Sequence, residues 1–165
     1  MNTILVTGGA GFIGSHFIDF LLKADSENYV INIDKLTYAG NLENLSFANS
    51  YKNYHFFKGD IVNRDLINYI FENYSPNIII NFAAESHVDR SINNPNDFIR
   101  TNVTGTANLL ACAKDYWSKS NYDDKLFFQI STDEVYGSLP LDRPEQKFTE
   151  DSLIAPHNPY SASKA

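Results

Sequence analysis

Hydrophobic and polar positions along the chain follow two alternating patterns. Short apolar runs, typical of buried strands, are followed by stretches in which apolar residues recur every three or four positions, as on one face of a helix. Strands that alternate with helices in this way predict an α/β fold with a parallel sheet and crossover helices. The apolar runs predict five strands, at residues 3–7, 29–33, 54–57, 77–82 and 125–131.

Helices are expected between these strands. The first begins near Ile13, and a short one covers residues 66–71 and ends before Pro76. Asn94 and Pro95 predict another helix start, because asparagine caps helices and proline fits their first turn. The helix that follows is expected to carry one apolar face, formed by Ile99, Val103, Ala107, Leu110 and Ala113.

A long loop is predicted near the end of the chain. Residues 137–159 contain four prolines and show little periodicity. Residues 158–165 then have the pattern of a helix start. Because the sequence ends inside that expected helix, we interpret the chain as part of a longer protein.

The composition is that of an ordinary globular domain. The chain has 165 residues, of which 43% are hydrophobic and 20% charged, enough for one domain with its own core. A formal charge of -7 argues against a nucleic-acid partner, which would need a basic face. The single cysteine, Cys112, allows no internal disulfide, and no metal site is expected.

The sequence shows no secretory leader and no apolar run long enough for a membrane helix, so we expect a cytoplasmic protein without a membrane partner.

A glycine-rich turn follows the first predicted strand. Gly8, Gly11 and Gly14 are spaced by three residues and open the first helix. Such glycines permit a tight turn, let the backbone approach a pyrophosphate and allow close packing of helix on strand. The free amides and partial positive charge of the helix start favour phosphate. The turn therefore predicts a dinucleotide site, the alternative being a tight turn without a ligand.

Acidic residues follow the second and third strands. Asp34 lies about 20 residues after Gly14, where a carboxylate can accept hydrogen bonds from the adenosine ribose. A carboxylate there repels a 2′-phosphate and so favours NAD over NADP, although the neighbouring Lys35 weakens this inference. Asp60 and Ile61 could receive the adenine amino group, but such a pair is more often a simple turn.

Two groups of residues have the pattern of acid–base chemistry. Tyr160 and Lys164 are four positions apart and share one helix face. A nearby ammonium is expected to lower the tyrosine pKa toward neutrality, so that the phenolate can take a proton from an alcohol as hydride leaves. Asp133 and Glu134 follow the fifth strand, at the sheet edge where ligands bind. They could act as proton donor and acceptor, or simply begin an acidic loop.

Several segments resemble known families. Residues 7–14, 81–84 and 160–164 resemble the extended short-chain dehydrogenases, and the narrower resemblance is to the dTDP-glucose 4,6-dehydratase family, through residues 34–41, 83–91 and 131–137. The resemblance implies a Rossmann-type doubly wound parallel sheet with helices on both faces and NAD as cofactor. Because the family is longer, residues 1–165 are expected to be an incomplete NAD-binding domain, truncated before the substrate domain.

The resemblance also implies a mechanism that acts on dTDP-glucose. Tyr160, supported by Lys164, would remove the hydroxyl proton at carbon 4 while hydride passes to NAD+. Glu134 would then take the proton on carbon 5, and Asp133 would protonate the hydroxyl that leaves carbon 6 as water. Return of the hydride to carbon 6 would give a 4-keto-6-deoxy sugar, with Thr132 hydrogen-bonded to the sugar near carbon 4.

Binding roles follow from the same motifs. Ser86, His87 and Thr132 would approach the substrate, and Arg90 would pair with Asp89, Glu85 or a phosphate. The residues expected to hold the cofactor are Gly8, Gly11, Phe12, Ile13, Gly14, Asp34, Lys35, Leu36, Thr37, Asp60, Ile61, Ala83, Ala84 and Thr101, together with Tyr160 and Lys164.

Two other functions remain open at this point. One is another NAD-dependent sugar-nucleotide enzyme, such as a 4-epimerase or a related dehydratase. The other is a non-catalytic NAD-binding module, although the presence of Tyr160, Lys164, Asp133 and Glu134 favours an enzyme. The family is usually dimeric through a helix pair that includes the tyrosine helix, so a homodimer is expected for the full-length protein.

Overall fold

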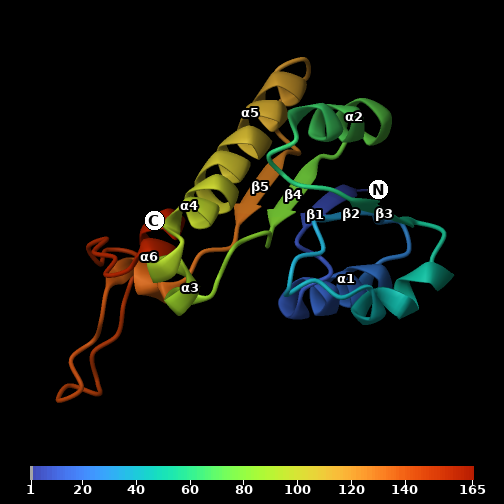
Figure 1. Cartoon of the computed structure of the whole chain (residues 1–165). Helices are drawn as coiled ribbons and strands as arrows, with labels where there is room; N and C mark the ends of the chain where they lie inside the picture. Colours follow the sequence, from blue (N-terminus) through green and yellow to red (C-terminus); the bar gives the residue numbers. More distant parts are fainter. Residues whose placement is uncertain (1) are drawn as a thin grey trace.

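The computed structural model describes residues 2–165. In this part of the chain, five parallel strands form one sheet in the order β3-β2-β1-β4-β5 (Figure 1). The order reverses at β1, and in doubly wound sheets ligands bind in the crevice beside that reversal. The five predicted strands are confirmed, with bounds β1 Thr3–Thr7, β2 Tyr29–Asp34, β3 Tyr54–Lys58, β4 Ile78–Asn81 and β5 Leu126–Gln129.

Helices cover both faces of the sheet, as expected. One face is covered by α1 (Phe12–Ala24) and by η1, a 3-10 helix at Leu42–Ser50. The other is covered by α2 (Arg64–Tyr74) and α5 (Thr106–Trp117) (Figure 1). Because neighbouring strand residues point to opposite faces, Val6 packs on the α1 side and Leu5 on the α2 and α5 side.

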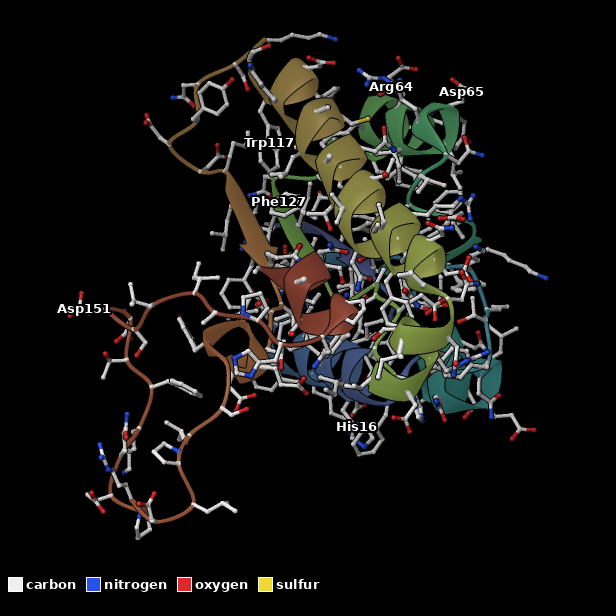
Figure 2. All side chains as sticks on the ribbon, turned by 60° about the vertical axis from the view of Figure 1, so that its left-hand side comes forward. His16, Arg64, Asp65, Trp117, Phe127 and Asp151 are labelled. Carbon is white, nitrogen blue, oxygen red and sulfur yellow. The ribbon has the colours of Figure 1, made fainter. Side chains whose placement is uncertain are left out.

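Each face has its own buried core. Figure 2 shows Trp117 of α5 beside Phe127 of β5, and Trp117 also donates a 2.8 Å hydrogen bond from Nε1 to the Pro76 carbonyl. A fully buried aliphatic side chain stabilises the fold by about 1.5–3 kcal/mol relative to an exposed one. The α1 face is filled by Ile4, Val6, Ala10, Ile18, Leu21, Leu22, Val30, Leu45, Ala48 and Ile80, and the other by Leu5, Ile31, Ile33, Ile61, Ile67, Ile70, Phe71, Ile79, Leu109, Cys112, Ala113 and Trp117.

The helix predicted after Asn94 begins with Pro95 in its first turn. It comprises α4 (Pro95–Phe98), a π-helical turn η2 (Ile99–Gly105) and α5. The expected asparagine cap does not form, since Nδ2 of Asn94 donates to Oδ2 of Asp97 at 2.6 Å instead.

The apolar face predicted for this helix points outward. Ile99, Val103 and Leu110 are 53%, 47% and 46% exposed. Ala107 is exposed beside them, whereas Ala113 is buried. The helix packs inward through its other face, formed by Phe98, Asn102, Gly105, Leu109, Cys112 and Trp117.

The last third of the chain returns to the carboxyl edge of the sheet. The 3-10 helix η3 (Asp133–Tyr136) follows β5, and α6 (Pro159–Lys164) lies close to α3 (Val88–Asn93) and α4. Between η3 and α6, residues 137–158 form the predicted loop, which stands away from the sheet with Asp151 near its outer part (Figure 2). None of the helices formed by residues 2–165 is long and apolar enough to cross a bilayer.

Candidate functional site

The glycine turn lies at the carboxyl end of β1. Gly8 has φ +69, and a Cβ there would lie 2.6 Å from the backbone nitrogen of Ala83, so only glycine fits. The amide of Gly8 donates to the Ile33 carbonyl at 2.9 Å, which ties the turn to β2. No side chain caps the start of α1, whose first residues, Phe12 and Ile13, are 77% and 64% exposed. The first amides of this helix are therefore open to a phosphate.

Asp34 links the glycine turn to the end of β2. Its Oδ2 accepts from the Ala10 amide at 2.9 Å and its Oδ1 from the Leu36 amide at 2.7 Å. A carboxylate has about four lone-pair sites, so both oxygens can still accept from a ribose. Leu36, with φ +58, turns back against the α1 core and does not line the cavity, unlike its neighbours Lys35 and Thr37.

Asp60 forms an ion-paired cluster beside Asp34. Its Oδ2 lies 3.0 Å from Nζ of Lys35 and 3.2 Å from NH2 of Arg100, and its Oδ1 accepts from the Val62 amide. Burial raises the pKa of Asp60, but the two cations and the amide together outweigh burial and leave that pKa below its ordinary value. Asp60 is therefore a carboxylate at neutral pH.

A cavity of about 410 Å³ lies along the carboxyl edge of the strands and contains most of the predicted cofactor residues. A second hollow of about 580 Å³ adjoins it and shares Lys35, Thr37, Glu85 and Thr101. Among the predicted residues, the cavity is lined by Gly8, Gly11, Phe12, Ile13, Gly14, Asp34, Lys35, Thr37, Asp60, Ile61, Ala83, Ala84, Ser86, Thr101, Tyr160 and Lys164.

Other predicted residues lie outside the cavity lining. His87 is exposed at the residue before α3, and no side-chain cap is formed there. Arg90 forms no ion pair with Asp89 or Glu85, and its guanidinium carbon lies 4.0 Å from the centre of the Tyr38 ring in a cation–π contact.

Tyr160 and Lys164 enter the cavity from α6. Burial raises the pKa of Tyr160, the charges of Glu134 and Asp133 raise it further, and the Thr132 hydroxyl opposes this only in part. Burial lowers the pKa of Lys164 from 10.5 to about 8. The expectation that Lys164 brings the Tyr160 pKa toward neutrality is wrong for this structure, because desolvation disfavours the charged form of both groups.

The acidic pair lies beside Tyr160, next to the cavity. Asp133 and Glu134 begin η3, where Oγ1 of Thr132 accepts from the Glu134 amide at 3.4 Å. Asp133 is exposed, whereas Glu134 is half-buried and accepts a 2.9 Å hydrogen bond from Nδ2 of Asn158. The two acids thus have different environments, and the fields of both reach the phenol. Neither they nor Thr132 belong to the cavity lining.

Asn102 is a site residue that the sequence analysis did not identify. It is 4% exposed, its Oδ1 accepts from the Glu85 amide at 2.9 Å, and its Nδ2 donates to the Glu85 carbonyl at 2.9 Å and to Oγ of Ser163 at 2.8 Å. It therefore joins the segment after β4 to the tyrosine helix. A polar residue flanked by helical apolar positions was the only signal for it in the sequence.

A second buried network aligns the strand ends. The Thr7 hydroxyl hydrogen-bonds to Oδ1 of Asn81 and accepts from the Ala83 amide at 3.1 Å. Nδ2 of Asn81 donates to Oε1 of Gln129 at 2.7 Å and to Oγ1 of Thr106 at 3.1 Å. These bonds hold the Ala83 backbone close to Gly8, and both residues line the cavity. Across residues 2–165, no group of three or more His, Cys, Asp or Glu side chains is arranged to hold a metal ion.

Comparison with known proteins gives consistent matches. Residues 5–165 match the model of the family described as GDP-mannose 4,6 dehydratase. The dTDP-glucose 4,6-dehydratase of Haemophilus influenzae is 49% identical over 168 residues, which cover 100% of this chain and 49% of that protein. A probable dTDP-glucose 4,6-dehydratase of Sinorhizobium fredii is 52% identical, covering 98% of this chain and 46% of that protein.

Solved structures agree with these relatives. The dTDP-glucose 4,6-dehydratase DesIV of Streptomyces venezuelae, solved with NAD bound, has a TM-score of 0.84–0.85 in two structures, and the one with the higher score is 43% identical. That match covers 98% of this chain and 48% of the DesIV chain. The chain spans about half the length of the curated relatives it matches.

Proposed function

Because this chain belongs to the GDP-mannose 4,6 dehydratase family, we propose that it forms the NAD-binding part of a dTDP-glucose 4,6-dehydratase. The reaction would convert dTDP-glucose to dTDP-4-keto-6-deoxyglucose by oxidation, loss of water and reduction. One observation carries the proposal: Tyr160 and Lys164 line the same cavity as the glycine turn, and the acids Asp133 and Glu134 lie beside Tyr160. The names of the similar enzymes support the choice of substrate.

The cavity fits a dinucleotide. The open amides of Phe12 and Ile13 would hold the pyrophosphate, and the free lone pairs of Asp34 would hold the adenosine ribose. NAD is favoured over NADP because Asp34 repels a 2′-phosphate, while Lys35 and Arg100 are both paired with Asp60. Bound NAD+ would accept the hydride that leaves carbon 4 of the sugar. The NADH so formed would return that hydride to carbon 6.

Tyr160 is the proposed base for the hydroxyl proton at carbon 4. Its raised pKa means that the neutral phenol dominates at pH 7 in the structure. A cationic ligand beside the ring would lower that pKa, because it favours the phenolate. Lys164, with a pKa of about 8, is mostly protonated at pH 7, so its charge would support the phenolate that forms as Tyr160 gives up its proton. The Thr132 hydroxyl, which partly offsets the rise in the Tyr160 pKa, would hydrogen-bond the sugar near carbon 4.

Asp133 and Glu134 are the proposed pair for water loss. Glu134 would accept the proton from carbon 5, and Asp133 would donate a proton to the oxygen that leaves carbon 6. Adjacent carboxyls can take opposite roles when their surroundings differ, and here one is exposed and the other is half-buried and hydrogen-bonded. Ser86, at the cavity, and His87, beyond it, would contact the substrate.

A homodimer in the cytoplasm is part of the proposal. The outward face of the helix that contains α5, with Ile99, Val103, Ala107 and Leu110, would form the contact between subunits. Exposed apolar stripes of this kind are typical of interaction surfaces. Val103→Glu should therefore shift the protein toward monomer in sedimentation, whereas an unchanged sedimentation profile would exclude this face.

The test uses the parent protein, by which we mean the longest natural polypeptide that contains this chain. Incubation with dTDP-glucose and NAD should give the 4-keto-6-deoxy product, and Glu134→Gln should lower its rate by about a hundredfold or more. A galactose-type product without loss of water would instead identify a 4-epimerase. Tight NAD binding without any turnover would identify a non-catalytic module.

A further inference from the structure

The Asn158 side chain connects the tyrosine helix to the acidic pair. Its Oδ1 accepts from the Ser161 amide at 2.8 Å, and its Nδ2 donates to Oε2 of Glu134 at 2.9 Å. One amide group therefore contacts both the start of α6, two residues before Tyr160, and the carboxylate in η3.

The helix start fixes the direction in which this amide points. Asn158 and Ser161 form a capping box, in which the Asn158 amide also donates to Oγ of Ser161 at 3.3 Å. Pro159 in the first turn restricts the backbone further, because its ring fixes φ. With Oδ1 held by the helix, the planar side chain has its Nδ2 directed at Glu134.

Glu134 has no cation to hold it in the described part of the chain. The ion pairs of residues 2–165 involve other carboxylates. A lysine or arginine partner would hold the carboxylate and also weaken it as a base, since a positive charge favours the ionised form. A neutral amide orients it through one oxygen and leaves the other lone pairs free to take a proton.

We infer that Asn158 is a positioning residue, which holds the Glu134 carboxylate in a fixed position relative to the phenol of Tyr160. This inference rests on the proposed function, because it takes Glu134 as the base for carbon 5. Asn158 acts through Glu134, so its loss should slow removal of the carbon-5 proton more than oxidation at carbon 4.

Three substitutions separate the two contacts of Asn158. Asn158→Ser retains a good helix cap but is too short to reach Glu134. Asn158→Asp retains the cap and places a second carboxylate against Glu134. Asn158→Ala removes both contacts. The matched control is Asn63→Ser, because Asn63 caps α2 by accepting from the Leu66 amide at 3.2 Å and lies outside the cavity lining.

The experiment measures the two half-reactions in the parent protein. Exchange of the carbon-5 hydrogen with D2O reports on Glu134, and single-turnover formation of NADH at 340 nm reports on Tyr160. Asn158→Ser should slow exchange and product formation by about tenfold to a hundredfold, and Asn158→Asp by at least as much. NADH formation and KM should change less than about twofold, and Asn63→Ser should behave as wild type.

Two outcomes would overturn the inference while leaving the proposed function intact. One is wild-type exchange in Asn158→Ser. The other is an equal slowing of NADH formation and exchange, which would mean that Asn158 serves only the fold of α6. Impairment of Asn158→Ala alone is a case of the first outcome, because the lost cap would then account for the effect. Absence of product from the unmodified parent protein would overturn the proposed function, and this inference with it.

Discussion

The ammonium of Lys35 lies 3.0 Å from Oδ2 of Asp60. The guanidinium of Arg100 approaches the same oxygen at 3.2 Å, so Lys35 and Arg100 are both paired with Asp60. In the proposed binding mode, Asp34 is then the unpaired charge nearest the adenosine ribose. This pairing supports the preference for NAD that Lys35 made less certain in the sequence, because a lysine held by Asp60 offers little to a 2′-phosphate.

Asp60→Asn should therefore weaken the preference for NAD. Loss of the carboxylate frees Lys35 and Arg100 to meet a 2′-phosphate, so the ratio of NADP to NAD affinity should rise about tenfold, or about 1.4 kcal/mol. Calorimetric titration with both cofactors measures the ratio directly. Asp65→Asn, on the exposed first turn of α2 (Figure 2), is the matched control and should leave it unchanged. An unchanged ratio in Asp60→Asn would remove Asp60 from the discrimination.

Lys164→Met should stabilise the fold in a pH-dependent manner. The Lys164 pKa is about 8 in the folded chain against 10.5 ordinarily, so between these values the unfolded chain binds the proton more strongly and stability rises with pH. Below pH 8 both states are protonated, and the full cost of the buried charge applies. The variant should therefore gain about 1–3 kcal/mol at pH 7, a gain that shrinks toward pH 10.5.

Urea unfolding at pH 7 and pH 10 tests this expectation. Lys23→Met is the control, because Lys23 is exposed and its ammonium pairs with Asp19 at 2.7 Å, so removing its charge should not stabilise the fold. A gain for Lys164→Met that stayed constant across the two pH values would show that the Lys164 charge is not the cause.

Gly8→Ala should damage both the fold and the cofactor site. The added Cβ would meet the Ala83 backbone at 2.6 Å, and φ +69 is unfavourable for alanine, so a loss of about 1–3 kcal/mol is expected. Gly11→Ala is a graded comparison, since Gly11 has φ -74 and the nearest atom to its Cβ would be 3.3 Å away. Thermal unfolding should rank Gly8→Ala as the less stable of the two, and the opposite ranking would contradict the geometry of the turn.

Asn102→Leu should loosen the tyrosine helix. It leaves the half-buried amide and carbonyl of Glu85 without partners, which is expected to cost about 2–4 kcal/mol of unfolding free energy. Hydrogen exchange of the Glu85 amide should rise with it. Asn93→Leu, which changes an exposed side chain in α3, should cost far less. Equal effects of the two substitutions would mean that the Asn102 network contributes little.

The sequence predicted those features that depend on local pattern. The five strands are short apolar runs, and the three-residue spacing of Gly8, Gly11 and Gly14 is visible in the sequence without knowledge of the fold. The elements η1, α3 and η3 were not predicted, because they are short and owe their conformation to packing rather than to a periodic pattern. The helix after Pro95 was predicted, but its buried face was not, because apolar residues lie on both faces of this helix and tertiary packing decides which face is buried.

Electrostatics and long-range contacts were the least predictable part of the site. The Tyr160–Lys164 spacing identified the pair, but burial decides the direction of both pKa shifts and depends on the whole fold. Asn158 could be read as a helix cap before Pro159, yet its second partner, Glu134, is remote in sequence. Such a contact forms only in the folded chain, where residues 137–158 bring α6 back beside η3.

Transfer of a label within one sugar tests the central claim most directly. The parent protein would be given dTDP-glucose that carries deuterium at carbon 4, and the product would be examined by NMR and mass spectrometry. The account predicts deuterium in the methyl group at carbon 6 of a 4-keto product. Deuterium that remained at carbon 4, in a sugar that had lost no water, would contradict it.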